Sequence, residues 1–337
     1  MKINDLKKSI KNVYQLYKTD KKYLAVMIWG APGVGKSAAI KQVAEELGIG
    51  IIDLRLSLLN PVDLRGLPTV NHKTHKAVWL EPEFLPNGNN NKEGILFLDE
   101  INLAPQSVMS AGYQLILDRQ LGNYKLPEGW LIVAAGNRTE DNAAITRFPA
   151  PLANRFIHFE IDNPDIEEWR KWAIQNGIAE EIVAFLSKLP QHLYQQAKTG
   201  EKAWKSPRTW SFASDLFKIG EKIDNAVGGA VAGEFYAFLN VYKNMPDIDK
   251  ILAGKETKVP EGLDILWALS TAITYRAKLE HLDNIFDYIN NFPKEFEVLI
   301  ILSLIDKDNK FRTAVASSPK WSKWIETNKE LLKYDEN

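Results

Sequence analysis

Cysteine is absent from this chain of 337 residues. Its absence excludes a disulfide framework, thiol-based catalysis and zinc held by cysteine. Long apolar runs are also missing. The longest one, from Phe296 to Ile305, contains a glutamate and a serine and fits a buried helix better than a membrane span. The N-terminal residues include no cleavable apolar segment of the secretory kind. We therefore expect a cytoplasmic protein that does not enter a membrane.

An excess of one charge is missing as well. The 42 lysines and arginines and the 43 aspartates and glutamates leave a net charge of −1, without any block of like charges. General attraction to nucleic acid is thus not built into the chain, and only a local basic patch stays open. His72 and His75 have no cysteine nearby, so we expect solvated side chains there and no metal site.

What the sequence does contain is a glycine-rich segment that ends in a lysine and a serine. Its spacing, Gly-x4-Gly-Lys-Ser, is formed by Gly30, Gly35, Lys36 and Ser37. The apolar run 24–29 before it predicts a buried parallel strand, and the apolar spacing over 38–47 predicts a helix after it. Strand, loop and helix in this order favour a phosphate-binding loop over a chance match in a glycine-rich turn.

Such a loop binds phosphate through backbone N–H groups that point inward and through the partial positive charge of the helix N-terminus. Lys36 would reach the β- and γ-phosphates, and Ser37 would offer its hydroxyl to Mg²⁺. The residues that we expect to hold the nucleotide are Gly30, Ala31, Pro32, Gly33, Val34, Gly35, Lys36, Ser37 and Ala38.

The pattern of apolar runs predicts two kinds of structure along the chain. Strands are expected at 24–29, 50–56, 94–98, 130–135 and 156–161. Helical patterns alternate with these strands, which indicates a doubly wound α/β domain with a parallel sheet. From Asn163 onward the pattern is helical only, with helices expected near 163 and at 209–219, 228–243, 263–280, 282–291, 294–305 and 319–333. Residues 1–22 predict an amphipathic helix that lies on the core, with a membrane-surface role as the weaker alternative.

Two carboxylates and an amide follow neighbouring strands of the expected sheet. Asp99 and Glu100 end the run 94–100, at the edge of a parallel sheet where ligands bind. Asp99 is expected to bind Mg²⁺ together with Ser37, and Glu100 to orient and deprotonate a water molecule. Asn137 closes the strand expected beside that of Asp99, where its amide can hold the attacking water and a γ-phosphate oxygen.

Arginines are the remaining candidates for catalysis. Arg155 lies just before the last expected strand, Arg147 lies eight residues earlier, and Arg208 lies at a helix start in the all-helical part. One arginine could contact the γ-phosphate in its own subunit, and another could reach the site of a neighbour. The alternative is that these arginines form structural ion pairs.

Several of these segments together resemble AAA+ ATPases, and more narrowly the MoxR-like, dynein-related branch. Gly-Ala-Pro-Gly-Val-Gly-Lys-Ser resembles the Walker A motif, and Ile-Leu-Phe-Leu-Asp-Glu-Ile-Asn-Leu-Ala resembles the Walker B motif. Val-Ala-Ala-Gly-Asn-Arg and Arg-Phe-Pro-Ala-Pro-Leu-Ala-Asn-Arg-Phe resemble the sensor 1 strand and the arginine-finger region, and Ser-Pro-Arg-Thr-Trp resembles the start of the sensor 2 helix. These motifs span residues 30–210.

The resemblance implies a role for each matching residue. Asn137 would be the sensor 1 residue, Arg155 the finger that acts in trans, and Arg208 the sensor 2 residue that acts in cis. Arg147 has no secure counterpart and would be a second finger or a support for Arg155. The cofactors implied are ATP and Mg²⁺.

The resemblance also implies a domain organisation and an assembly. Residues 1–162 would form the AAA+ α/β domain around a five-stranded parallel sheet, with a helix-2 insert at about 60–86 and a pre-sensor hairpin at about 118–129. Residues 163–337 would form a helical lid with a C-terminal extension. Relatives form rings, usually hexamers, that remodel proteins or insert metals, often beside a partner with a von Willebrand A-type domain.

The leading hypothesis is therefore an ATPase that works in a ring to remodel a partner protein. A nucleic-acid motor, such as a helicase, a loader or a restriction subunit, shares this machinery, but the near-neutral charge argues against it. A scaffold that binds nucleotide without hydrolysing it is the third hypothesis, and the complete set of catalytic residues argues against that one.

Overall fold

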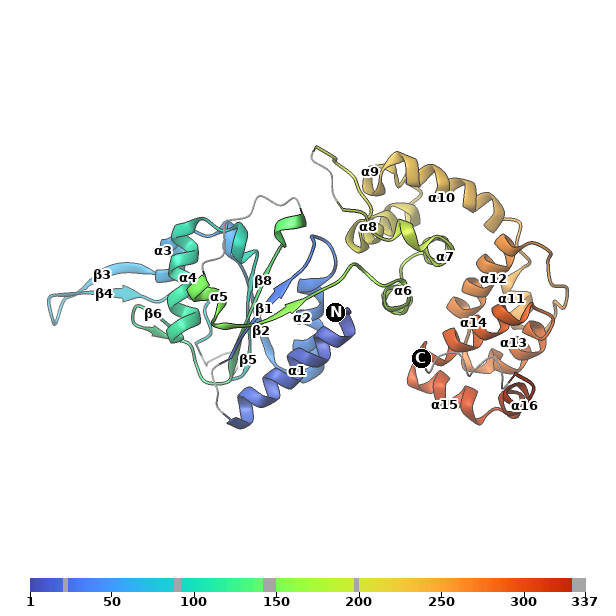
Figure 1. Cartoon of the computed structure of the whole chain (residues 1–337), viewed down its shortest axis with the longest axis horizontal. Coiled ribbons are helices and arrows are strands. Elements are labelled where there is room, and N and C mark those ends of the chain that lie inside the picture. The colour runs from blue at the N-terminus through green and yellow to red at the C-terminus, as the bar shows by residue number, and fades with distance from the viewer. Residues whose placement is uncertain (21–23, 88–91, 142–149, 197–199, 329–337) are drawn as a thin grey trace. The chain divides into compact units, whose positions relative to one another are not determined.

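The computed structural model describes residues 1–20, 24–87, 92–141, 150–196 and 200–328. The chain separates into two compact units. Unit 1 comprises residues 1–164 and 196–201, and unit 2 comprises residues 165–195 and 202–337. Figure 1 labels most of the helices and strands of both.

Unit 1 is built on a parallel sheet of five strands in the order β2-β5-β8-β1-β9. The strands are β1 (Ala25–Trp29), β2 (Gly50–Arg55), β5 (Gly94–Asp99), β8 (Trp130–Gly136) and β9 (Phe156–Glu160). Every residue of β5 and β8 is buried, as expected for central strands that helices cover on both faces. The predicted α/β class with a five-stranded parallel sheet is thus confirmed.

Helices and two small hairpins complete unit 1. The helices are α1 (Ile3–Asp20), α2 (Lys36–Leu47), α3 (Pro61–Arg65), α4 (Gln106–Asp118) and α5 (Ala150–Ala153). One face of α1 buries Leu6, Ile10, Tyr14 and Tyr17, which confirms the amphipathic helix on the core. The hairpins pair β3 (Leu67–Asn71) with β4 (Lys76–Leu80) and β6 (Gln120–Leu121) with β7 (Tyr124–Lys125). The first hairpin lies within residues 60–86, where a helix-2 insert but no strand is expected from the sequence.

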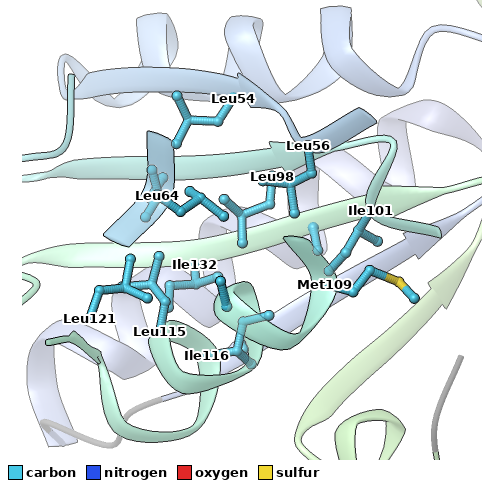
Figure 2. Close-up of a cluster of buried hydrophobic side chains, with 14 of the residues drawn as sticks. Leu54, Leu56, Leu64, Leu98, Ile101, Met109, Leu115, Ile116, Leu121 and Ile132 are labelled. Atoms are coloured by element: carbon cyan, nitrogen blue, oxygen red, sulfur yellow. The ribbon is translucent and has the colours of Figure 1, made fainter. Parts of the chain in front are cut away.

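The core of unit 1 fixes the edge of the sheet that carries the candidate site. Figure 2 shows Leu98 and Ile132 of the central strands packed with Met109 and Leu115 of α4. Leu56 and Ile101, which follow β2 and β5, belong to the same cluster and are fully buried. Burying such side chains contributes about 2 kcal/mol each, so the turns after both strands are held firmly against α4.

Unit 2 is helical throughout the part that the structure describes. Its helices are α6 (Ile166–Gln175), α7 (Glu180–Lys188), α8 (Pro207–Lys218), α9 (Asp224–Val227), α10 (Gly229–Tyr242), α11 (Ile248–Leu252), α12 (Leu263–Arg276), α13 (Leu282–Ile289), α14 (Lys294–Ile305), α15 (Asn309–Ser317) and α16 (Pro319–Asn328). One hydrophobic cluster gathers around Phe185 and Trp210, and a second gathers around Phe286 and Ile300. Tyr242 and Met245 pack against both clusters and join them. Within the described residues, no helix combines the length and the apolar character that crossing a membrane requires.

Lys307 closes the C-terminal end of α12 inside unit 2. Its ammonium donates to the carbonyl oxygens of Thr274, Tyr275 and Ala277 at 2.8, 3.0 and 2.7 Å. The last carbonyls of a helix lack partners within the helix, and a cation there also opposes the helix dipole. Burial lowers the pKa of Lys307 to about 8, so this side chain is still protonated at neutral pH.

We expect Lys307→Met to lower the free energy of unfolding by about 2 kcal/mol, because the substitution leaves three carbonyl groups without a donor. Urea denaturation of the full chain at pH 7 measures this change. Lys310→Met, which alters an exposed lysine on α15, is the matched control and should leave the denaturation midpoint unchanged. Equal midpoints for the two variants would contradict a capping role for Lys307.

Candidate nucleotide-binding site

The glycine-rich loop joins β1 to α2 at the carboxyl edge of the sheet. Gly33 and Gly35 have φ values of 79° and 105°, in the left-handed region that residues with a side chain rarely adopt. Gly35 is also the N-cap of α2, whose first backbone N–H groups have no partner within the helix. The sequence thus forms a tight turn that leaves a helix N-terminus beside the loop, which is the arrangement that binds phosphate.

Lys36 is held in the loop by three oxygens. Its ammonium donates to the carbonyls of Gly30 and Ala31 at 2.6 and 2.9 Å and to Oδ1 of Asn137 at 3.2 Å. The side chain is only 8% exposed, so the charge lies inside the site rather than in solvent. A phosphate at this position would gain a charge-assisted hydrogen bond from a cation that is already in place.

Ser37 and Asp99 meet across the site. Ser37 Oγ donates to Asp99 Oδ2 at 2.6 Å, which joins the first turn of α2 to the end of β5. Oxygen ligands on adjacent corners of a Mg²⁺ octahedron, with bonds of about 2.1 Å, lie about 3 Å apart. The hydroxyl and carboxylate oxygens therefore fit Mg²⁺ in both chemistry and spacing. Within the described residues, no cluster of three acidic or histidine side chains offers another metal site.

Glu100 follows Asp99 in an unusual backbone conformation. Its φ is 56°, in the left-handed region, and its N–H donates to Asp99 Oδ1 at 2.9 Å. The carboxylate accepts a hydrogen bond from the hydroxyl of Ser57, in the 3-10 helix Leu56–Leu58 that follows β2. Ser57 and the left-handed turn together orient a half-buried carboxylate beside the phosphate-binding loop.

Asn137 lies where the sequence predicted, directly after a strand that pairs with the strand of Asp99. The side chain is 9% exposed, and its Oδ1 contacts the Lys36 ammonium. Its backbone N–H and its backbone carbonyl both form hydrogen bonds with the side chain of Asn102. The amide is thereby fixed between the phosphate-binding loop and the carboxylates.

The arginines are placed differently. Arg155 is exposed and makes no ion pair with another described residue. Arg208 is likewise exposed, and it lies at the start of α8 in unit 2 rather than in unit 1. Arg147 lies outside the described residues. Arg138, which the sequence did not single out, forms an ion pair with Asp141, with 3.0 Å between its guanidinium nitrogen and the carboxylate Oδ1. This arginine therefore has a structural partner within unit 1.

Lys36, Ser37, Asp99, Glu100 and Asn137 therefore come together at one edge of unit 1. Sequence reasoning missed Ser57 and Asn102, which contact members of this group. Ser57 carries no motif signal, because a serine after a strand is common. Asn102 lies within the segment that resembles a Walker B motif, and its position two residues after Glu100 was the available signal.

A glycine-rich loop between a central parallel strand and a helix, with this lysine, serine and aspartate, defines the P-loop class of nucleotide-binding proteins. Residues 26–162 match the model of the family described as ATPase family associated with various cellular activities (AAA). This part, which is less than half of the chain, is therefore similar to the AAA ATPase family domain. The match covers the sheet, the loop and every candidate residue except Arg208.

Similarity to characterised proteins is more distant. The chain is 28% identical over 184 residues to midasin of Giardia intestinalis, which covers 51% of this chain and 4% of midasin. It is 24% identical over 202 residues to midasin of Dictyostelium discoideum, which covers 56% of this chain and 3% of that protein. The chain thus matches only a small part of each midasin.

Solved structures show weak similarity. A RuvB mutant from Thermotoga maritima is 18% identical, covers 85% of this chain and 86% of its own, and gives a TM-score of 0.42. NtrX from Brucella abortus in complex with ATP is 15% identical, covers 95% of this chain and 67% of its own, and gives a TM-score of 0.40. Similarity at this level says nothing about function.

Proposed function

We propose that this protein hydrolyses ATP with Mg²⁺ and uses the reaction to remodel a partner protein. The observation that carries the proposal is the contact of Lys36 with Asn137 and of Ser37 with Asp99 around the loop. Phosphoryl transfer needs the phosphates held, their charge neutralised and a nucleophile placed in line, and this site offers a group for each task.

Each side chain would have one task in this reaction. Lys36 binds the β- and γ-phosphates, while Ser37 and Asp99 hold Mg²⁺, which would neutralise charge on the phosphate oxygens. Asn137 orients the attacking water and a γ-phosphate oxygen. Glu100 accepts the proton of that water, and Ser57 holds its carboxylate in place until the water is bound. Arg208 would contact the γ-phosphate from the same chain.

Assembly into a ring is part of the proposal, because an exposed Arg155 has no described partner of its own. A hexamer is the form we propose, with Arg155 reaching the nucleotide of the neighbouring subunit. We further propose that the chain belongs to the MoxR-like branch. Its target would be a partner protein, such as one with a von Willebrand A-type domain. Capture of proteins by an ATP-loaded Glu100→Gln chain would identify that partner, and stimulation of ATP hydrolysis by DNA or RNA would instead favour a nucleic-acid motor.

Lys36→Met tests nucleotide binding directly. It removes the ammonium but keeps a side chain of similar length, so we expect ATP affinity to fall about tenfold to a hundredfold. A fluorescent ATP analogue titrated against the purified chain gives the dissociation constant. Lys41→Met is the matched control, because Lys41 is an exposed lysine on the same helix that forms an ion pair with the partly buried Asp53. If Lys36→Met bound ATP with wild-type affinity, the proposal that this loop binds the phosphates would be wrong.

A further inference from the structure

Asn137 follows β8 at a point where the pairing with β5 has ended but the pairing with β1 has only just ended. The β5–β8 ladder ends with Leu98 opposite Ala134, because the chain turns away after Asp99. The β1–β8 ladder continues to Gly136, whose carbonyl then accepts from the N–H of Gly30 at 3.3 Å. The β5 side of Asn137 therefore has no strand beside it to pair its backbone.

The side chain of Asn102 takes the place of that missing strand. Its Nδ2 donates to the carbonyl of Asn137 at 2.7 Å, and its Oδ1 accepts from the N–H of Asn137 at 3.1 Å. A carboxamide carries the same donor and acceptor as a peptide group, so it can pair with both backbone groups at once. Asn102 is 1% exposed, so both hydrogen bonds are shielded from solvent.

Gly136 is what allows Asn102 to approach so closely. A Cβ atom built on Gly136 would lie 2.6 Å from Oδ1 of Asn102 and 2.8 Å from the end of Met27. Any other residue there would displace one of them. Gly136 does not have a positive φ, so no turn requires a glycine there. Its lack of a side chain instead leaves room for the side chain of Asn102.

From these contacts we propose that Asn102 is a positioning residue that aims the Asn137 side chain at Lys36 and the γ-phosphate. The two hydrogen bonds restrain the backbone of Asn137, whose side-chain Oδ1 lies 3.2 Å from the Lys36 ammonium. Among the described residues, the Asn102 side chain hydrogen-bonds with Asn137 and not with Lys36, Asp99 or Glu100, so it acts through Asn137. The inference rests on the proposed ATP hydrolysis.

Asn102→Leu tests this role, because it keeps the size of the side chain and removes both hydrogen bonds. We expect kcat for ATP to fall about tenfold to a hundredfold while KM stays within about threefold, as when an outer partner of a catalytic group is lost. In an Asn137→Ala background, the same substitution should reduce kcat less than about twofold further, because the side chain it aims is gone. A purely structural residue would give the same fold-loss in both backgrounds, and that result would overturn the proposal.

Two further variants keep the test decisive. Asn102→Asp has the same shape but sets an oxygen against the Asn137 carbonyl, and it should show the same fall in kcat if Asn102→Leu does not fold. Asn284→Leu removes a comparable amide–carbonyl bond in unit 2, at 2.9 Å from Leu252, and should leave kcat unchanged. A folded Asn102→Asp chain with wild-type kcat overturns the proposal.

Glu100→Gln, assayed in parallel, separates this inference from the proposed function. A wild-type chain without ATP turnover, or a Glu100→Gln chain that turns over normally, overturns the proposed function and this inference with it. An inactive Glu100→Gln chain beside a fully active Asn102→Leu chain overturns the inference alone.

Discussion

Replacing Glu100 with glutamine is expected to lower the rate of ATP hydrolysis about a hundredfold to ten-thousandfold, the usual contribution of a positioned general base. Glutamine has the same size and can still accept the hydroxyl of Ser57, which the Glu100 carboxylate now accepts. It cannot take a proton from water at neutral pH. ATP affinity should stay within about threefold, because Lys36 and the loop bind the phosphates without Glu100.

Phosphate release measures the rate, and the fluorescent analogue used for Lys36 measures the affinity. Glu128→Gln is the matched control, since Glu128 is an exposed glutamate in the same unit and makes no ion pair with the described residues. It should hydrolyse ATP at the wild-type rate. A Glu100→Gln chain that retains a tenth or more of that rate would show that another group activates the water.

The central sheet was predictable from the sequence because its strands are buried on both faces. Such strands appear as continuous apolar runs, and the runs at β1, β5 and β8 are bounded by glycine or by charged residues. The loop was predictable for a similar local reason, since its function requires glycines and a lysine at fixed spacing. Features that depend only on residues close together in the sequence, such as these strands and this loop, could thus be predicted without the structure.

The hairpin of β3 and β4 could not be predicted in the same way. Nearly all of its side chains are exposed, so neither strand shows the alternation of a half-buried strand. Pro68 lies inside β3 and argues against a strand, although a proline is tolerated where a strand is at an edge. From the sequence, no strand is therefore expected within residues 60–86.

The supporting groups of the site were hidden for another reason. The bonds of Ser57 with Glu100 and of Asn102 with Asn137 join residues 43 and 35 positions apart. Both depend on where the chain turns after a strand, and on a left-handed φ at Glu100 that no local pattern announces. Motifs identify the groups that we propose to contact the nucleotide, whereas the groups that orient them depend on tertiary packing.

Arg155→Ala is expected to lower ATP hydrolysis about a thousandfold or more, in the range of other arginine fingers. The side chain is exposed and has no ion-pair partner among the described residues, so its removal should not disturb unit 1. Arg312→Ala, which alters an exposed arginine of unit 2 with only a 3.9 Å contact to Asp306, is the control and should remain active. Loss of activity by itself, however, does not tell whether Arg155 serves its own subunit or the next one.

Mixing two inactive variants resolves this question. An Arg155→Ala subunit keeps Glu100 and lacks the finger, whereas a Glu100→Gln subunit keeps the finger and lacks the base. In a randomly mixed ring with equal amounts of both, about one interface in four joins an intact Glu100 to an intact Arg155, if each contact is between neighbours. The mixture should therefore regain up to about a quarter of wild-type hydrolysis, with the maximum near equal amounts and a loss upon dilution below the assembly concentration. Activity that stays at the level of the separate variants at every ratio would mean that Arg155 acts within its own subunit or not at all, because no arrangement of the two chains would then complete a site.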